Sequence, residues 1–363
     1  MRVAVVLEQA LAAVPGGTGR YAVELARELA GLDGVEVAGW TAWHSDLSAA
    51  VVPGASGPSR FPLGRRGLIA AWERGVGPAP RGGDLVHAPT LLLPPRRRAP
   101  LVVTVHDAVP WTHPETLTPR GVRWHRRMAE RAVRQADAVV VPSRATADAL
   151  ADHLPLRERP HVVPLGRTDL PVPEDAADRL VRLGVPAGGY VLSLATLEPR
   201  KGLDVLVRAM ARRGAPDLPL VLVGASGWGG VVPQDIAAAE GLPAGQVQVL
   251  GRVDDQDLAA VLNGATVLAV PSRAEGFGLP VLEGMAAGIP VVTSRDPALL
   301  EVGGSAVLPA ATADAEALAD ALGQVCADAD LRGAMVAAGR RRAAEHTWRR
   351  TAEHQAEVYR SLV

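Results

Sequence analysis

Residues 275–283, Glu-Gly-Phe-Gly-Leu-Pro-Val-Leu-Glu, decide the predicted fold. The apolar run before them, residues 265–270, predicts a buried strand, and Met285-Ala286-Ala287 after them favours a helix. Pro280 fits the first helical position, because its missing N–H would have no partner there. Glycines let a backbone approach a ligand closely, and free N–H groups at a helix start attract anions. The stretch therefore predicts a strand, a glycine loop and a helix start that bring two carboxylates and several donors into one small volume.

The two glutamates of this stretch have two interpretations. Taken singly, either one fits a plain strand-to-helix turn with an acidic residue near a helix N-terminus. Carboxylates also accept hydrogen bonds from the paired hydroxyls of a ribose or hexose. The complete nine-residue pattern favours the binding role.

The pattern E-G-F-G-L-P-x-L-E resembles the signature of the retaining nucleotide-sugar glycosyltransferases of family 4, which have the GT-B fold. The resemblance implies that Glu275 lies beside the donor sugar and that Glu283 binds the nucleotide ribose. It also implies that the backbone at Phe277, Gly278 and Leu279 meets the sugar and the diphosphate.

Lys201 is the only lysine among 38 basic residues. It follows Arg200 just before a predicted helix, and two cations at a helix start oppose its dipole unless an anion is present. A compact ammonium differs from a guanidinium in shape and hydration, so a single lysine favours a function, with chance as the alternative. The resemblance implies that Arg200 and Lys201 bind the donor phosphates, with Arg200 in place of an arginine that many members have at Thr196. A surface salt bridge is the other interpretation.

Two motifs in the first half of the chain complete the predicted site. Pro15-Gly16-Gly17-Thr18-Gly19 precedes a helix predicted from Arg20, but it lacks the G-x-G-x-x-G spacing of dinucleotide-binding proteins. The resemblance implies that Gly16 and Gly17 lie at the donor diphosphate and the acceptor; a plain turn is the alternative. His106-Asp107 follows a predicted strand, 101–105, and resembles the His-Asp pair at the family's acceptor side, which places His106 above His87 as a candidate.

Further candidates follow the strands predicted at 220–223 and 247–250. Gly224, Arg252 and Val253 stand at carboxyl-end positions, where ligands gather in open α/β sheets, and a base could bind main-chain groups there. The sequence shows no Asp-x-Asp and no His/Cys cluster suited to holding a cation at a diphosphate, so we expect neither a metal nor another cofactor. Cys326 is the only cysteine, which excludes a disulfide.

Composition limits the partners and the location. The formal net charge is −1, which argues against a nucleic-acid partner. Residues 1–170 hold 21 arginines and 16 acidic residues, so this basic half and its predicted helix 120–136 could contact a membrane or an acidic acceptor. Arg123, Arg126, Arg127, Arg131 and Arg134 lie on that helix, and a solvated face is the alternative. No signal peptide or membrane-spanning run is apparent, and we expect a cytoplasmic protein.

The predicted fold class is α/β, with two doubly wound Rossmann-like domains that face each other across a cleft, as in GT-B. We expect an acceptor-side domain at 1–170, a nucleotide-sugar-binding domain at 171–345, and a C-terminal helix at 346–363 that packs back on the first domain.

The predicted reaction moves a hexosyl group, with mannose and GDP favoured, from a nucleoside diphosphate sugar to an acceptor hydroxyl with retention of configuration. The acceptor could be a glycan, a lipid-linked molecule or a small molecule. The alternatives are a sugar-nucleotide epimerase or hydrolase of the same architecture, a non-catalytic two-domain sugar-binding protein, and an NAD-dependent oxidoreductase.

Overall fold

The computed structural model describes all residues, 1–363, and divides into two compact units. Unit 1 comprises residues 1–112, 119–166 and 347–363, and unit 2 comprises residues 113–118 and 167–346. The units change at 166/167 and 346/347, close to the predicted boundaries at 170/171 and 345/346. No pattern in the sequence predicts that the short segment 113–118 belongs with unit 2.

Unit 1 contains a seven-stranded sheet in the order β3-β2-β1-β4-β5-β6-β7, and every strand pair in it is parallel. Its strands are β1 (Arg2–Val6), β2 (Glu36–Trp43), β3 (Ser56–Gly64), β4 (Leu85–Ala88), β5 (Leu101–Thr104), β6 (Ala138–Val141) and β7 (His161–Val162). The central strands are nearly continuous apolar runs, because helices cover both faces of a parallel sheet.

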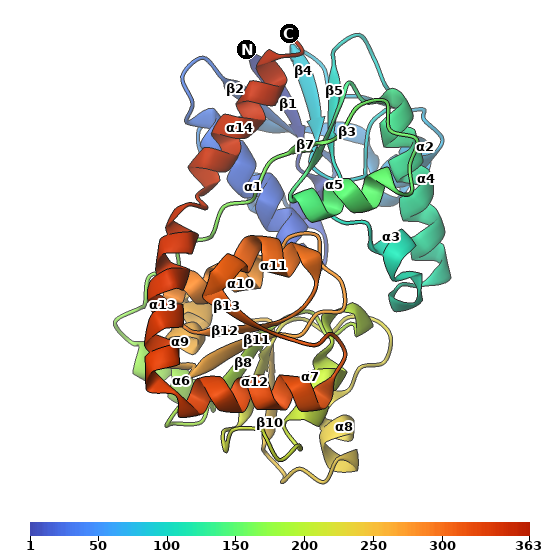
Figure 1. The fold of residues 1–363 in the computed structure, drawn as a ribbon. Coiled ribbons are helices and arrows are strands. Elements are labelled where there is room, and N and C mark those ends of the chain that lie inside the picture. Colours follow the sequence, from blue (N-terminus) through green and yellow to red (C-terminus); the bar gives the residue numbers. More distant parts are fainter. The chain divides into compact units, whose positions relative to one another are not determined.

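The helices of unit 1 lie over the two faces of this sheet (Figure 1). They are η1 (Glu8–Leu11), α1 (Gly16–Ala30), η2 (Ser48–Ala50), α2 (Arg65–Glu73), α3 (Val109–Thr112), α4 (Pro119–Gln135), α5 (Arg144–Ala151) and α14 (Trp348–Arg360). The last helix, α14, packs against α1 near the start of the chain (Figure 1). Both chain termini therefore belong to unit 1.

Unit 2 contains a six-stranded parallel sheet in the order β10-β9-β8-β11-β12-β13. Its strands are β8 (Val191–Leu194), β9 (Leu220–Val223), β10 (Val247–Gly251), β11 (Val267–Val270), β12 (Val291–Ser294) and β13 (Val307–Ala310). The strand order reverses between β8 and β11, as it does between β1 and β4 in unit 1. Each unit is thus doubly wound, with one point at which the order reverses.

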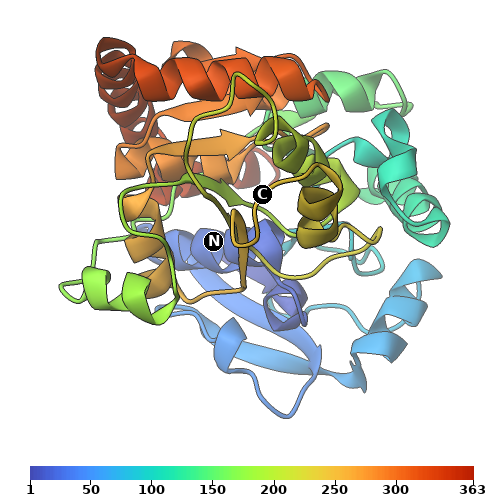
Figure 2. The ribbon, with the colours of Figure 1, turned by 90° about the horizontal axis from the view of Figure 1, so that it is seen from below.

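The helices of unit 2 cover both faces of its sheet, as the second view also shows (Figure 2). They are η3 (Pro114–Thr116), α6 (Ala176–Arg182), η4 (Pro199–Lys201), α7 (Leu203–Ala209), α8 (Pro233–Ala239), α9 (Asp255–Gly264), α10 (Leu279–Ala287), α11 (Pro297–Gly303), η5 (Gly304–Ala306), α12 (Ala315–Ala327) and α13 (Ala329–Ala344). Unit 2 begins with a segment that has no regular structure, residues 168–173, which we call the linker.

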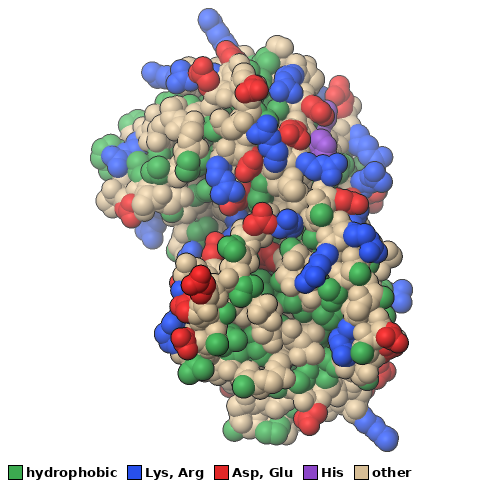
Figure 3. Space-filling model, turned by 90° about the vertical axis from the view of Figure 1, so that its left-hand side faces the viewer, with side chains coloured by type: hydrophobic (Ala, Val, Ile, Leu, Met, Phe, Trp, Pro, Cys, Tyr) green, Lys and Arg blue, Asp and Glu red, His purple; other side chains and the backbone are tan.

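Helix α4 matches the predicted basic helix, but one of its arginines does not face solvent. Arg131 is buried, and its guanidinium donates to the carbonyls of Trp72 and Pro94 and to the Gln135 side chain. Arg131 therefore cannot contribute to a basic surface. On the face drawn in Figure 3, basic and acidic side chains are interspersed.

Candidate functional site

The best-formed cluster of charged side chains lies where the strand order of unit 2 reverses. The loop after β8 carries Arg200 and Lys201, and the loop after β11 carries Glu275. Parallel strands end at one edge of the sheet, and loops from neighbouring strands on either side of a reversal form the usual ligand-binding crevice of open α/β sheets. This topology brings residues that are 74 and 75 positions apart into contact.

Lys201, Arg200 and Glu275 form one buried network. The Lys201 Nζ lies 2.6 Å from Glu275 Oε1, and an Arg200 guanidinium nitrogen lies 2.9 Å from Glu275 Oε2. The Glu275 side chain is 8% exposed and the Lys201 side chain 14%. Arg200 also pairs with Glu198 at 2.8 Å and donates to the Ala274 carbonyl. The charges of two cations and two carboxylates balance within the cluster.

This network keeps Glu275 ionised. Burial alone would raise the pKa of its carboxyl, but the attraction of Lys201 and Arg200 and hydrogen bonds from Lys201 and Ser272 outweigh burial and lower the pKa to about 2. The Ser272 hydroxyl donates to Glu275 Oε1 at 2.7 Å. Glu275 is therefore a fixed hydrogen-bond acceptor at any physiological pH.

Asp296 supports the same loop from the next strand. Its carboxylate accepts from the backbone N–H of Glu275 at 3.1 Å and caps α11 through the N–H groups of Ala298 and Leu299. Burial, together with the nearby charge of Glu275, raises the pKa of Asp296 to about 6 against the backbone bonds that lower it. The Glu275 carboxyl therefore resists protonation, whereas the Asp296 carboxyl, which bonds to the Glu275 backbone, accepts a proton readily.

Two details of the sequence prediction were wrong here. Arg200 and Lys201 do not begin a helix: they lie in the 3-10 turn η4, and α7 starts only after Gly202, which has φ 65°. The anion that offsets their charge in the structure is Glu275 of the same chain, so their position does not by itself require a bound diphosphate. Pro280 occupies the second position of α10, because the helix begins at Leu279.

The predicted glycine loop is present before α10. Gly278 has φ 109°, a conformation that favours glycine, and a side chain there would also collide with Leu299. The backbone of Leu279 opens the helix. The ring of Phe277 is buried and contacts His346 edge-on, with ring centroids 6.0 Å apart, so only the backbone of Phe277 is suited to ligand contact.

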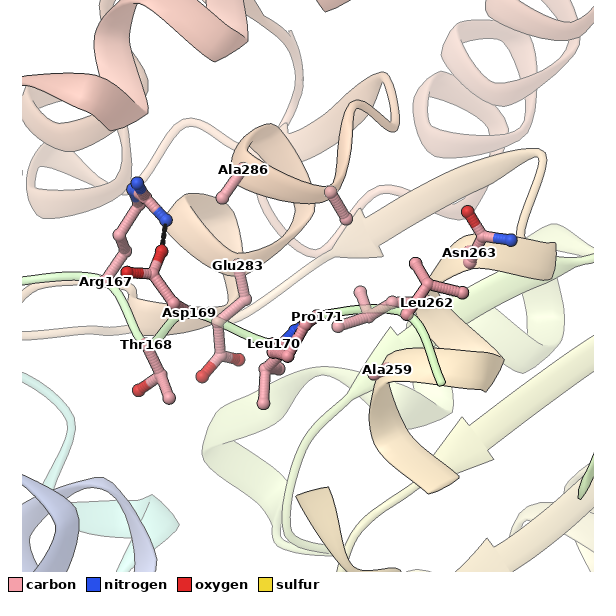
Figure 4. Close-up of a pocket in the computed structure, with 12 residues that line it drawn as sticks. Arg167, Thr168, Asp169, Leu170, Pro171, Ala259, Leu262, Asn263, Glu283 and Ala286 are labelled. Atoms are coloured by element: carbon pink, nitrogen blue, oxygen red, sulfur yellow. Dashed lines mark hydrogen bonds and ion pairs between the residues drawn. The ribbon is translucent and has the colours of Figure 1, made fainter. Parts of the chain in front are cut away.

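Glu283 lines a pocket of about 380 Å³ in unit 2, between α9, α10 and the linker. It extends from α10 toward the linker residues Thr168 and Leu170, whereas Asn263 lies at the other end of the pocket (Figure 4). Arg167 forms an ion pair with Asp169 at the linker end. Glu283 follows Glu275 by eight residues, and Glu275 does not line this pocket.

The remaining candidates of unit 2 follow β9 and β10. Gly224 has φ 156° and its N–H donates to the Gly251 carbonyl at 2.9 Å; a side chain at Gly224 would strike the Ala195 carbonyl. Arg252 is exposed and Val253 half-buried, in the turn before α9. All three stand at the carboxyl edge of the sheet, as predicted from the strand ends.

His106 lies in unit 1, just after β5. Its Nε2 is 2.7 Å from the Pro89 carbonyl, which can only accept, so Nε2 carries a proton and Nδ1 is the acceptor of the neutral ring. Burial lowers the pKa of His106, although the bond to Pro89 and the charge of Asp107 act the other way. The imidazole is therefore held neutral in one tautomer, beside the ring of Tyr21 with centroids 4.9 Å apart.

Gly16 and Gly17 form the first turn of α1 rather than a loop before it. The helix was predicted from Arg20 but begins at Gly16, which has φ 60°. Their backbone N–H groups therefore lie at a helix start, where they lack hydrogen-bond partners within the helix.

Two buried polar networks of unit 1 escaped the sequence analysis. His87 joins Thr104 at 2.9 Å and the Tyr359 hydroxyl at 2.6 Å, and Tyr21 joins the same threonine at 3.0 Å. His87, ranked below His106, thus has a structural role that ties α14 to the sheet. The second network is Glu8 with Arg65 and His44. The paired residues are far apart in sequence. Glu8, a charged residue directly after an apolar run, is the only local sign of either network.

No group of three or more His, Cys, Asp or Glu side chains is arranged to hold a metal ion. No helix is both long and apolar enough to cross a bilayer.

Comparisons with known proteins match both halves of the chain. Residues 186–342 match the family model described as glycosyl transferases group 1, and residues 15–168 match that of glycosyltransferase family 4. An MMP alpha-(1→4)-mannosyltransferase of Mycolicibacterium hassiacum is 32% identical over 73% of this chain and 66% of its own. A D-inositol 3-phosphate glycosyltransferase of Saccharomonospora viridis is 35% identical over 64% and 58%. The chain spans about half to two thirds of the length of the curated relatives it matches.

A solved structure confirms the fold class. HepE of Anabaena, crystallised with UDP and glucose, superimposes over the full length of both chains with a TM-score of 0.77 at 20% identity. This likeness shows the GT-B fold, and the two family models together cover most of the sequence on either side of the linker. The chain therefore belongs to the family 4, group 1 glycosyltransferases.

Proposed function

We propose that the chain transfers a hexosyl group from a nucleoside diphosphate sugar to an acceptor hydroxyl, with retention of configuration. The observation that carries the proposal is the Lys201–Glu275–Arg200 network at the strand-order reversal of unit 2. In a member of this family, an ammonium and an ionised carboxylate at this edge suit the two halves of such a donor, the diphosphate and the sugar.

Lys201 is better suited than Arg200 to bind the leaving diphosphate. An ammonium has three N–H donors, and its one hydrogen bond in the structure is to Glu275, so two donors remain for phosphate oxygens. Most of the Arg200 donors are already engaged with Glu198, Ala274 and Glu275. Charge on the diphosphate grows as the glycosidic bond breaks, so a fixed ammonium favours the transition state over the ground state. We assign Arg200 the task of holding Glu275 in place.

Glu275 has the properties of a sugar-binding group. Its carboxylate stays ionised and is held by three side chains, so it offers hydrogen-bond acceptors in a fixed position to donor-sugar hydroxyls. The N–H groups at the start of α10 are suited to phosphate. Glu283 is assigned to the ribose hydroxyls, and the main chain at Gly224, Arg252 and Val253 to the base.

Mannose from GDP-mannose is the donor we favour. One relative is named a mannosyltransferase, but another is named for D-inositol 3-phosphate, and HepE was solved with UDP and glucose. We further propose that no metal takes part, because cationic side chains provide the charge that a cation would give the diphosphate. Activity that EDTA abolishes and magnesium or manganese restores would contradict this.

The experiment is incubation with a panel of UDP-, GDP- and ADP-linked hexoses, with chromatography of the nucleotide and NMR of the sugar product. We expect nucleoside diphosphate release from one donor class, a glycoside product and an unchanged anomeric configuration. Conversion of the sugar without a glycoside would indicate the epimerase or hydrolase instead. Binding without any turnover would indicate a sugar-binding protein.

A further inference from the structure

Unit 1 has a pocket of its own, of about 220 Å³, beside His106. Its lining comes in part from the loop after β1, from α1, from the loop after β5 and from α4, and includes Gln9, Thr18, Asp107, Trp124 and His125. Arg65, the first residue of α2, adds the only guanidinium. The pocket is small enough to hold one sugar-sized group.

The positive charge of Arg65 is already compensated inside the protein. Its guanidinium lies 3.1 Å from the Glu8 carboxylate and also donates to the Glu8 carbonyl. Glu8 is only 1% exposed and cannot exchange this partner for water. A buried carboxylate that lost its cation would be strongly destabilised, so Arg65 is committed to Glu8.

The other lining groups leave the pocket slightly negative. Asp107 is a carboxylate whose Oδ1 accepts from the Val109 N–H at 3.1 Å. His106 is held neutral by burial and by its bond to Pro89. With Arg65 offset by Glu8, Asp107 is the one formal charge among the lining side chains that no ion pair balances. A phosphate group placed there would meet the Asp107 carboxylate, and the only guanidinium in the lining is already paired with Glu8.

The uncharged groups match a polyhydroxylated ring. The Gln9 amide nitrogen and the Thr18 hydroxyl both donate to the Pro15 carbonyl, at 3.2 and 3.3 Å. The Gln9 amide oxygen and the Thr18 hydroxyl oxygen therefore remain as acceptors for hydrogen bonds from a ligand. Trp124 is half-buried and supplies an apolar ring surface, with His125 edge-on at 4.8 Å between centroids. Acceptor oxygens beside one aromatic surface suit a ligand with many hydroxyls and apolar C–H groups.

We propose that this pocket binds the acceptor, and that the part of the acceptor held there is an uncharged polyhydroxylated ring rather than a phosphorylated one. The identification of this ligand as the acceptor rests on the proposed function. It separates this chain from a relative named for an inositol phosphate, whose substrate carries the charge that the pocket disfavours.

Ligand-observed NMR on the intact chain tests the proposal without any donor or turnover. The probes are matched pairs with and without a phosphate: methyl α-mannoside with mannose 6-phosphate, and myo-inositol with inositol 3-phosphate, at about pH 8. We expect at least one uncharged ring to bind, with its phosphorylated partner weaker by about tenfold, as for a like charge in a partly desolvated site. Asp107→Asn is expected to narrow that gap several-fold.

Two arginine variants provide the control. Arg65→Met removes the pocket's guanidinium, and Arg66→Met removes its exposed neighbour, which does not line the pocket. Tighter binding of a phosphorylated probe, lost in Arg65→Met but kept in Arg66→Met, would overturn the proposal. So would a lack of binding by every uncharged ring, with the fold checked by a thermal melt. If rings bind here but no nucleotide sugar turns over, the proposed function fails while the pocket's preference stands.

Discussion

The two sheets have the same strand order for their first six strands, but the loops at their carboxyl edges differ in charge. In unit 2, Arg200, Lys201 and Glu275 are packed together, with Glu198 as a further carboxylate. In unit 1, the corresponding edge carries a neutral imidazole, an amide, a hydroxyl and a single unbalanced carboxylate beside a small pocket. The same backbone plan therefore supports two different kinds of binding site.

The difference follows from what each site would handle. A departing diphosphate develops charge, and fixed ionic groups in a poorly solvated site stabilise that charge more effectively than water does. An acceptor hydroxyl needs orientation more than charge. If this difference decides function, the ionic groups of unit 2 govern donor chemistry and the neutral groups of unit 1 govern acceptor chemistry.

The largest effect is expected from Lys201→Ala. It removes the ammonium at the leaving group, and kcat should fall by about 10²–10³, comparable with the loss of one preorganised donor. Lys201→Arg keeps the charge with another shape and should restore only part of the rate. Steady-state turnover measures both variants.

The control for Lys201 is Arg273→Met. Arg273 lies in the Glu275 loop and forms a bidentate pair with Asp204 at 2.8 Å, without touching Glu275. Both variants lose a partly buried ion pair, so both should have a somewhat lower melting temperature. Only Lys201→Ala should lose more turnover than its lower stability explains. Equal losses of kcat in the two would show that Lys201 acts through folding alone.

Glu283→Ala should weaken nucleotide binding with little effect on the fold. If the carboxylate accepts bonds from both ribose hydroxyls, the loss is about 1.5–3 kcal/mol, the range for hydrogen bonds to charged groups. A donor lacking the 2′ and 3′ hydroxyls should lose little further affinity on the variant. Calorimetry of all four combinations measures this cycle, and additive losses would rule out the contact.

His106 should control turnover and pH dependence rather than nucleotide affinity. Since the pKa of His106 lies below 6.5, the neutral ring persists, and kcat should stay flat from about pH 8 to about pH 6.5 and fall only in more acidic solution. His106→Ala should lower kcat by about tenfold or more and leave nucleotide affinity unchanged. Wild-type turnover in His106→Ala would remove the residue from the site.

The last effect, that of Asp296→Asn, is expected in stability. A pKa raised from 3.8 to about 6 means that Asp296 stabilises the fold fully below pH 3.8, and that this contribution is lost as the pH rises to 6. Glu275, lowered from 4.5 to about 2, acts oppositely and loses its contribution as the pH falls from 4.5 to 2.

Asparagine cannot titrate, so the stability difference between Asp296→Asn and wild type should shift in favour of the variant by about 1–3 kcal/mol between pH 4.5 and 7. Urea unfolding at both pH values measures the shift. Asp254→Asn is the matched control, because Asp254 caps α9 in the same way from an exposed position. A pH-independent difference for Asp296→Asn would contradict the assignment of its pKa.

The strands and the loop at 275–283 could be predicted because their signals are local. Apolar runs mark the buried strands, and glycines with Pro280 mark the turn into α10. Residues 53–67 are rich in Gly, Pro and Arg, a composition that predicts an irregular surface loop, but 56–64 form strand β3 and α2 begins at Arg65. β3 pairs only with β2, and an edge strand tolerates the prolines and polar residues that argued against it.

Pairings between distant residues could not be predicted in the same way. Glu275 and Lys201 were each candidates, but nothing in the sequence around either residue showed that the Glu275 carboxylate would bind the Lys201 ammonium. The Tyr359–His87 bond spans 272 residues, and the burial of Arg131 depends on carbonyls from two other segments. Such contacts follow from the tertiary packing of the sheets, not from residue spacing.

The central claim is that the ionic network of unit 2 holds the donor diphosphate. Calorimetry of GDP and GMP on wild type and Lys201→Ala tests it directly, with UDP and UMP if uridine donors prove active. We predict that wild type prefers the diphosphate by about 10–100-fold, as for hydrogen bonds to a charged group, and that Lys201→Ala loses most of that preference while keeping its affinity for the monophosphate. An undiminished preference in a folded Lys201→Ala protein would contradict the claim.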